Sequence, residues 1–424
     1  MAKLQFSRNA KVYITNVATS PNFVWSIPVL DGFSFSQATN SSEITLNEMA
    51  DSNGNSRRGR QMFNDSYAPA EWSFSTYIRP FVSAGGTQGL LSTNAATSAV
   101  TCAVEEILWA QMVGTGAYTA PNFANLTKAD AATGLDISFA SSNKVTLGTF
   151  DLLFSLGEDA DSPVYKIEGC CVNEASIDFD IDGIATINWS GMGKIVKELE
   201  SPEVIRATAA PAAGATGQFW FDTNQPGYPL HVSQSTGVGT NWKREINEGA
   251  SDTDTGNFIR NRLTSLTMVA ADSTLYPGTT IDGVAGTYST VITGGNVTIS
   301  NNMTFLTPET LGIVNQPLGH VTGTRSIGGN FTCYLNMDAG SSADLFEDII
   351  ENTADVTNSF DLTFGVGGTT SNTSRVELHM ETCHLEVPTH SMDDVISLEV
   401  NFHALPSTIG GTNELKVKYF GTTL

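Results

Sequence analysis

The chain has 424 residues, and its 44 acidic and 21 basic residues give a formal net charge of −23. The length allows two or three domains with cores of their own. The acidity argues against a protein that binds nucleic acid by neutralising phosphates. Only 15% of the residues are charged, so Ser, Thr, Asn and Gly must supply most of the polar surface, a composition typical of β-rich assemblies.

The cysteines and the N-terminal residues indicate the compartment. The five cysteines are an odd number without a repeated spacing, which predicts free thiols in a reducing compartment; they are Cys102, Cys170, Cys171, Cys333 and Cys383. Residues 1–16 contain no apolar run typical of a secretory signal. No window has the length and apolarity of a membrane helix, so we expect no membrane binding by this chain.

Short alternating runs separated by Gly, Asn, Asp and Pro predict an all-β fold with few helices. An early strand is predicted at residues 32–46. Residues 71–78 alternate most cleanly, with Trp72, Phe74, Thr76 and Ile78 on one face and Ser73, Ser75 and Tyr77 on the other. The apolar spacing at residues 103–113 predicts a helix, and strands are expected at residues 150–157 and 174–191.

Residues 201–250 follow as a segment without a counterpart elsewhere in the chain. An Ala/Pro/Gly run at residues 206–217 is interpreted as a flexible linker. A small β module comes after it, with a turn at residues 224–227. We expect the module to lie on the outside of the assembly and to be dispensable for it, with an aromatic core of Phe219, Trp220, Phe221, Tyr228 and Trp242.

The second part of the chain repeats the elements of the first in the same order. Strands are predicted at residues 295–311, 327–337, 360–367 and 383–404, and a helix at residues 342–352 with Ser342 as its N-cap. Five matching elements predict a tandem duplication. The expected domains are residues 1–200 (first copy), 201–250 (insertion) and 251–424 (second copy), each copy a β-sandwich or partial barrel with one helix.

Three segments have residue types that could hold a metal. Asp178, Asp180 and Asp182 share one face of a predicted strand, which favours a solvated acidic face over a calcium site, because no loop geometry supports the latter. Residues 251–257 fit a calcium loop poorly. The histidines and cysteine near the C-terminus lack the ligand spacing of a zinc site; they are His379, Cys383, His384, His390 and His403.

Catalytic equipment is not recognisable in the sequence. There is no GxSxG motif and no phosphate-binding loop, and histidine occurs only after residue 230, so the first copy has no histidine to act as a general base. The sequence therefore predicts a protein that is not an enzyme and binds no cofactor or metal.

The densest basic cluster lies at residues 56–60 and contains Arg57, Arg58 and Arg60. It falls in a long polar loop between the first two matched strands. Two interpretations remain open: a solvated loop, or a contact with an acidic neighbouring subunit, since this chain's own surface is an obvious anionic partner.

Several runs resemble the major tail tube proteins of long-tailed bacteriophages of the T-five type. In the first copy these are residues 40–48, RRGR, FNDS and AEWSFSTYI, with INWSG closing it. In the second copy the run is ITGGNVTISNNMTFLTPE. The resemblance covers both copies. The segment 201–249 does not belong to the family's tube-domain pattern, and the immunoglobulin-like C-terminal domain of some relatives has no counterpart in the sequence.

The resemblance implies a structural virion protein. Three duplicated chains would close a ring, and stacked rings would form the hollow tail tube through which DNA leaves the capsid. The implied partners are further copies of the chain and other tail proteins (tape measure, baseplate or tip, terminator), with DNA only in transit. The implied location is the virion tail, assembled in the host cytoplasm.

The dimensions agree with such a conduit. Six domains that each give four strands, at a spacing of about 4.8 Å and a tilt near 40°, would form a barrel of roughly 150 Å circumference. Side chains would leave a channel of about 35–40 Å, and a duplex is roughly 20 Å wide. The main alternative is a receptor-binding or lectin-like virion protein that uses exposed aromatic residues, namely Trp220, Phe221, Tyr228 and Trp242.

Overall fold

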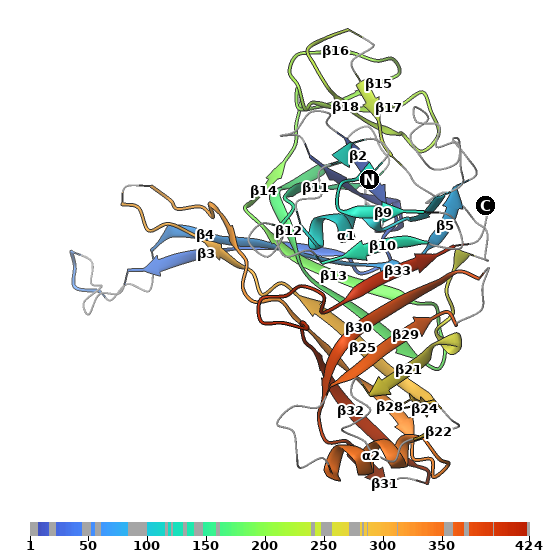
Figure 1. Cartoon of the computed structure of the whole chain (residues 1–424). Helices are drawn as coiled ribbons and strands as arrows, with labels where there is room; N and C mark the ends of the chain where they lie inside the picture. Colours follow the sequence, from blue (N-terminus) through green and yellow to red (C-terminus); the bar gives the residue numbers. More distant parts are fainter. Residues whose placement is uncertain are drawn as a thin grey trace.

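The computed structural model of the protein (Figure 1) describes residues 7–16, 23–44, 52–55, 61–83, 100–114, 118–119, 122–129, 134–139, 147–157, 162–238, 242–246, 257–270, 280–281, 284–285, 287–311, 313–351, 359–368, 373–392 and 394–421. Most of these residues lie in β-strands. Two α-helices are present among them, α1 (Glu106–Met112) and α2 (Ser342–Glu351). The predicted all-β class is confirmed.

The first half, up to residue 200, folds into two layers that share one long strand. The outer layer has the order β2–β1–β11–β12–β14 and the inner layer the order β3–β4–β13–β12. The strands are β1 (Ala10–Thr15), β2 (Val24–Ile27), β3 (Ser34–Glu43), β4 (Met62–Tyr77), β11 (Phe150–Leu156), β12 (Val164–Asp180), β13 (Thr186–Gly193) and β14 (Ile195–Glu198). Strand β12 belongs to both layers, because its first part pairs with β11 and β14 and its second part with β13.

The second half shows the same pairing pattern. Its outer layer has the order β24–β21–β29–β30–β33, and its inner layer runs β25–β28–β32 and then the end of β30 with β31. The strands are β21 (Ser265–Ala270), β24 (Thr287–Thr290), β25 (Ile292–Ser300), β28 (Ser326–Tyr334), β29 (Phe360–Val366), β30 (Arg375–Leu385), β31 (Thr389–Met392), β32 (Ile396–Ala404) and β33 (Lys416–Phe420).

Two register irregularities fix how the halves correspond. The β11·β12 ladder shifts after Phe150, which lies opposite Cys170, and the β29·β30 ladder shifts after Phe360, which lies opposite Cys383. Cys383 therefore occupies the position of Cys170. Tyr334 likewise occupies the position of Tyr77. Tyr77 is the last paired residue of β4 in the β4·β13 ladder, and Tyr334 is the last paired residue of β28 in the β28·β32 ladder.

The inner layers of the two halves join into one continuous sheet. The second part of β12 pairs antiparallel with β25, from Glu174 opposite Ser300 to Asp180 opposite Gly294. The resulting order is β3–β4–β13–β12–β25–β28–β32 and then the end of β30 with β31, and we call this row of strands the joint sheet. It is open within one chain, with β3 at one edge and β31 at the other.

The core lies between the joint sheet and the outer layers. The predicted alternation in β4 is confirmed, because Trp72, Phe74 and Thr76 are buried. Helix α1 begins three residues later than expected, since residues 100–103 form strand β6 (Val100–Ala103), which pairs with β5 (Pro80–Ser83). All of α1 is buried, and its Trp109 meets Trp189 of β13 edge to face at 5.1 Å.

Helix α2 begins where the sequence predicts, but Ser342 does not act as the expected N-cap. Its hydroxyl donates to the Tyr334 carbonyl oxygen at 2.7 Å, which fastens the helix to the end of β28. The apolar residues of α2 only partly face the core, because Leu345 is buried and Ile350 is 49% exposed.

An arm projects from the body, to the left in Figure 1. It combines the far part of the β3·β4 hairpin with a hairpin of the second half, formed by β26 (Thr304–Leu306) and β27 (Gly319–Val321). The Tyr67 N–H donates to the Asn315 carbonyl oxygen at 2.9 Å, which ties the two hairpins together.

The remaining strands are short. On the first half they are β7 (Tyr118–Thr119), β8 (Asn122–Phe123), β9 (Leu126–Lys128) and β10 (Leu135–Ser138), and on the second β22 (Thr280–Ile281) and β23 (Val284–Ala285). Strand β33 pairs with β30 on one side and with β10 on the other. The C-terminal strand therefore links the two halves a second time.

The inserted segment forms a small sheet above the first half (Figure 1), in the order β15–β17–β18–β20. Its strands are β15 (Val204–Ala207), β17 (Phe219–Asp222), β18 (Leu230–Ser233) and β20 (Trp242–Arg244), with β16 (Ala212–Ala213) paired to β19 (Gly237–Val238). The predicted turn at residues 224–227 joins β17 and β18. The predicted flexible linker is wrong, because the indole N–H groups of Trp220 and Trp242 donate to the Ala207 and Pro211 carbonyls and hold this run in place.

Candidate functional site: the polar face and free edges of the joint sheet

One face of the joint sheet is polar and acidic. Its strands, over residues 34–43, 62–77, 171–180, 186–193, 292–300, 326–334, 383–392 and 396–404, contain no Lys or Arg. Their acidic residues are Glu43, Asp65, Glu71, Glu174, Asp178, Asp180, Glu386 and Glu399. Since the apolar residues of these strands face the core, the carboxylates gather on the side turned away from it.

Neutral side chains hold these carboxylates in place. The Ser75 hydroxyl donates to Asn188 Oδ1 at 2.6 Å, and the Asn188 amide donates to Asp178 Oδ2 at 3.0 Å, a chain across three strands. In the second half the Asn330 amide donates to Glu399 Oε1 at 3.1 Å. Amide and hydroxyl donors fix the carboxylates without neutralising them, so the face keeps its negative charge.

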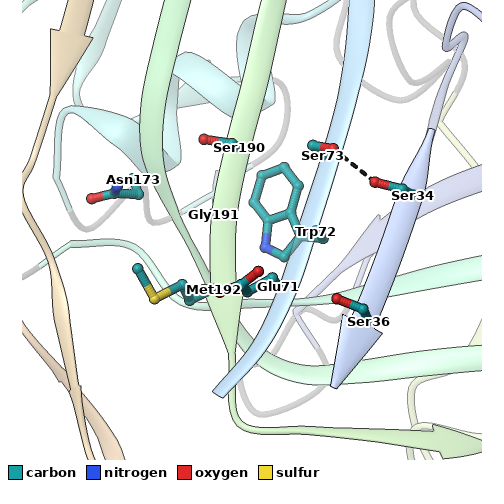
Figure 2. Close-up of a pocket in the computed structure, with 9 residues that line it drawn as sticks. All are labelled: Ser34, Ser36, Glu71, Trp72, Ser73, Asn173, Ser190, Gly191 and Met192. Carbon is teal, nitrogen blue, oxygen red and sulfur yellow. Dashed lines mark hydrogen bonds between the residues drawn. The ribbon is translucent and has the colours of Figure 1, made fainter. Parts of the chain in front are cut away.

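The first half has a hollow at this sheet, with a volume of about 260 Å³ (Figure 2). It is lined by Ser34, Ser36, Glu71, Trp72, Ser73, Asn173, Ser190, Gly191 and Met192. Gly191 is required here, because a Cβ at this position would lie 2.4 Å from a ring carbon of Trp72. The hydroxyls of Ser34 and Ser73 are hydrogen bonded at 2.9 Å, as Figure 2 shows.

The corresponding place in the second half holds a hydrogen-bonded cluster on β32 and the residue after β30. Asn401 and His403 lie where the first half has Ser190 and Met192. The Asn401 amide donates to Glu386 at 2.9 Å, and His403 Nε2 lies 3.1 Å from the same carboxylate. These hydrogen bonds, the one from Asn401 first, lower the pKa of Glu386. The carboxylate therefore stays ionised, and the polar face keeps its charge in both halves.

The two edges of the joint sheet differ from its interior seam in burial. At the β12·β25 seam, Ile177, Phe179 and Val297 are buried. Met392 occupies the position of Phe179 at the β31 edge and is 74% exposed. Phe35 occupies the position of Val297 at the β3 edge and is only half-buried. Both edges present strand backbone and incompletely covered apolar side chains.

The basic cluster predicted as a contact with a neighbouring subunit, Arg57, Arg58 and Arg60, lies outside the described residues. The strands that flank it, β3 and β4, form the projecting arm. Exposed apolar residues lie on the same arm, including Phe63 and, from the second-half hairpin, Leu306 and Leu318.

The aromatic residues of the insertion are not the exposed surface that the receptor-binding alternative requires. Phe219, Trp220 and Phe221 are buried. Trp220 stacks on His231 at 4.5 Å and meets Trp242 at 5.8 Å. Tyr228 packs partly buried against the same small core.

The module is seated on an apolar patch of the first half. Its Phe219, Phe221, Leu230 and Val232 form one buried cluster with four residues of the underlying outer layer, namely Tyr13, Val24, Leu153 and Val164. The signal for this contact was present in the sequence but missed: β1 and β11 have apolar residues on both faces (Val12, Tyr13 and Ile14; Leu152, Leu153 and Phe154), as expected of a strand covered on both sides.

A carboxylate is buried where β33 meets α1. Glu105 is fully buried, and burial raises its pKa to about 7. The backbone N–H of Arg79 donates to Glu105 at 3.4 Å, and the Trp109 indole donates to the Tyr419 hydroxyl at 2.7 Å. The neighbouring Glu106 is paired with Lys128 at 2.6 Å.

The side chains weighed as metal ligands have other roles in the described part of the chain. Asp178 accepts a hydrogen bond from Asn188, and Asp182 lies 3.9 Å from Arg262. His379 pairs with Asp361 at 2.9 Å. No group of three or more His, Cys, Asp or Glu side chains suited to a metal ion occurs among the described residues. The five cysteines are free and buried, and neither helix of the described chain is long and apolar enough to cross a membrane.

Comparison with known proteins bears on what this surface does. No family model matches the chain. Over 99% of its length it is 28% identical to the tail tube protein pb6 of Escherichia phage T5, and the match covers 78% of that relative. The resemblance to T5-type tail tube proteins is confirmed. The T5 relative is a structural protein, and this likeness supports the prediction that the chain is not an enzyme.

Proposed function

We propose that the chain is a structural building block of a phage tail tube, in which copies close into rings and the rings stack around a channel. The observation that carries the proposal is the open joint sheet. Its interior seam, β12·β25, joins two similar four-strand units, and its two outer edges offer the same two kinds of strand unpaired. A head-to-tail contact that repeats the seam generates a ring when its rotation closes, as we propose here.

The seam predicts the register of the contact between chains. Inside one chain, Asp178 pairs with Asn296 across the seam. Ser34 of β3 is equivalent to Asn296, and Ser391 of β31 is equivalent to Asp178. By the same shift, Thr389 of one chain would lie opposite Ser36 of the next. The added ladder would cover both edges, and edge strands left open are prone to uncontrolled pairing.

Three chains of two units each would give the six units and the channel of about 35–40 Å described above. The two halves would then be copies of one tube domain in tandem, which their shared pairing order supports. The closed ring would place the polar face of the joint sheet around the channel, because the opposite face packs on the core.

The charge of that face suits a conduit for DNA. A surface with carboxylates and without Lys or Arg repels phosphate, so a duplex would slide past without binding. The likeness to the T5 tail tube protein supports a location in the virion tail, which we propose is built in the host cytoplasm with tape measure, tip and terminator proteins as partners. The arm with Arg57, Arg58 and Arg60 is proposed to reach the neighbouring ring.

A backbone test separates ring closure from folding. In the β12·β25 ladder the residues matching His390 and Met392 direct their N–H groups across the seam. Met392→Pro removes one such donor at an exposed position, while Met392→Ala keeps it. Each lost hydrogen bond costs about 1 kcal/mol per seam, so electron microscopy should show rings and tubes for the wild type and the alanine variant and few or none for the proline variant.

Thermal unfolding of the unassembled chain should differ little between the two variants, since Met392 lies at an edge. Discrete particles without rings in the wild type, or rings of normal abundance in the proline variant, would contradict the proposal. Charge reversal of the three arginines should impair tube growth and leave single rings intact.

A further inference from the structure

The segment that leads into the second half covers one end of the first half. Phe258 meets Tyr77 edge to face at 5.4 Å, and the Arg79 guanidinium lies 4.7 Å from the centre of the Phe258 ring. The Ala185 N–H donates to the Ile259 carbonyl at 2.8 Å. Residues 257–261 therefore cap the end of the joint sheet at β4 and β13.

The corresponding end of the second half has no such cap among the described residues. Tyr334, at the position of Tyr77, is 45% exposed, and Ile396, at the position of the buried Ala185, is 38% exposed. The positions are equivalent by hydrogen bonding as well, because Ile78 donates to Ala185 and Leu335 donates to Ile396. Val395 beside them is 58% exposed. We call this surface of Tyr334, Val395 and Ile396 the uncapped end.

The chain contains a second segment that resembles the cap. A short 3-10 turn precedes the first strand of each half, Ser7–Asn9 before β1 and Asn261–Leu263 before β21. Aligning these turns places Leu4 at the position of Phe258. The sequence pattern Phe-x-Arg-Asn occurs at residues 6–9 and again at residues 258–261, and it instead matches Phe6 to Phe258. Either alignment brings an apolar side chain to the capping position.

We propose that the residues before β1 of one chain cap the uncapped end of the neighbouring chain, with Leu4 or Phe6 packed on Tyr334. The inference rests on the proposed ring. In that ring, the first half of one chain is placed next to the second half of its neighbour in the same way as the two halves are placed within one chain. The occupant is thus a second copy of this protein, and the contact locks adjacent chains at a place distinct from the strand edges.

Cysteine pairs test the contact directly. Leu4→Cys and Phe6→Cys are each combined with Tyr334→Cys, and assembled rings are treated with a mild oxidant. Covalent dimers and trimers are expected on a denaturing gel for at least one pair. The native cysteines do not compete, because all five are buried. The pair Phe258→Cys with Tyr77→Cys is the matched control and should cross-link within one chain, leaving a monomer.

The outcomes separate this inference from the ring itself. Suppose that rings are visible by microscopy and the control pair forms its disulfide, but neither Leu4→Cys nor Phe6→Cys links to position 334. This result would overturn the capping contact and would not contradict the proposed function. Failure of the wild type to form rings would overturn both.

A second measurement needs no cross-link. Phe6→Ala is expected to raise the concentration needed for ring formation about tenfold, the equivalent of one lost aromatic contact, and to leave the unfolding of the unassembled chain unchanged. Phe258→Ala, by contrast, should lower the unfolding temperature of the single chain. Equal ring formation by Phe6→Ala and Leu4→Ala variants and the wild type would count against the cap.

Discussion

The outer layers of the two halves have the same strands but different outward faces. In the first half the outward residues are Tyr13, Val24, Leu153 and Val164, and the inserted module covers them. Their counterparts in the second half are Thr267, Thr287, Thr363 and Glu377. One architecture thus tolerates either a covered or a bare outer face, and a few side chains decide which.

The difference revises the expectation that the module can simply be removed. Replacing residues 205–248 with a short Gly/Ser linker would expose the four apolar residues, and each loses roughly 1.5–3 kcal/mol of burial. We expect loss of soluble protein, measured as the yield after purification. Adding Tyr13→Thr, Val24→Thr, Leu153→Thr and Val164→Glu, the residues of the second half, should restore a soluble chain that forms rings.

Persistent insolubility of the rescued deletion would show that the module contributes more than a cover. Ring formation by the simple deletion, with unchanged solubility, would show that the apolar patch tolerates water. The difference between the two outer faces would then contribute little to the stability of the chain.

A single exchange tests the same difference between the two outer faces. Leu153→Thr removes buried apolar volume under the module and adds a hydroxyl without a partner, so the free energy of unfolding should fall by about 2–4 kcal/mol. The reverse change at the matching site, Thr363→Leu, places a leucine on a partly exposed face and should change it by less than about 0.5 kcal/mol. Chemical denaturation of both variants checks the difference, and equal effects would argue that the module does not protect Leu153.

The helices give a further contrast, because α1 is buried throughout and α2 has an exposed side. Glu105 beside α1 has its pKa raised to about 7 by burial, against an unfolded value near 4.5. Its favourable contribution is therefore complete below pH 4.5 and is lost as the pH rises through 7. Between pH 5 and 9 the free energy of unfolding should fall by a few kcal/mol, on the order of 3.

Glu105→Gln should flatten this dependence, since the amide cannot ionise. Glu386→Gln is the control: the lowered pKa of Glu386 puts its titration below this range, so the slope should persist. Parallel curves for wild type and Glu105→Gln would mean that another group causes the dependence.

Local patterns predicted the fold well, and the contacts between distant segments less so. The alternation of Trp72, Phe74 and Thr76 predicted β4, and the matching order of elements predicted two similar halves. The flexible linker was wrong because Ala, Pro and Gly indicate flexibility only when nothing holds them. The indoles of Trp220 and Trp242 hold the carbonyls of Ala207 and Pro211. Such long-range partners have no local signature.

The candidate site was harder to predict for the same reason. The absence of Lys and Arg from the joint sheet is visible in the sequence, but only the β12·β25 pairing shows that these strands form one surface. The aromatic residues of the insertion were read as both a core and an exposed surface, and the packing of Trp220 decides for the core.

The β12·β25 seam also has a consequence for the symmetry of assembly. Half of the seams of a proposed ring are intramolecular. They form at the effective concentration set by the covalent connection between the halves, often millimolar for short connections, and need no encounter between molecules. The covalent link also frees the two halves from having to be identical. A tube built this way would be nearly sixfold along its channel and strictly threefold on its exterior, where a module would stand on every second unit.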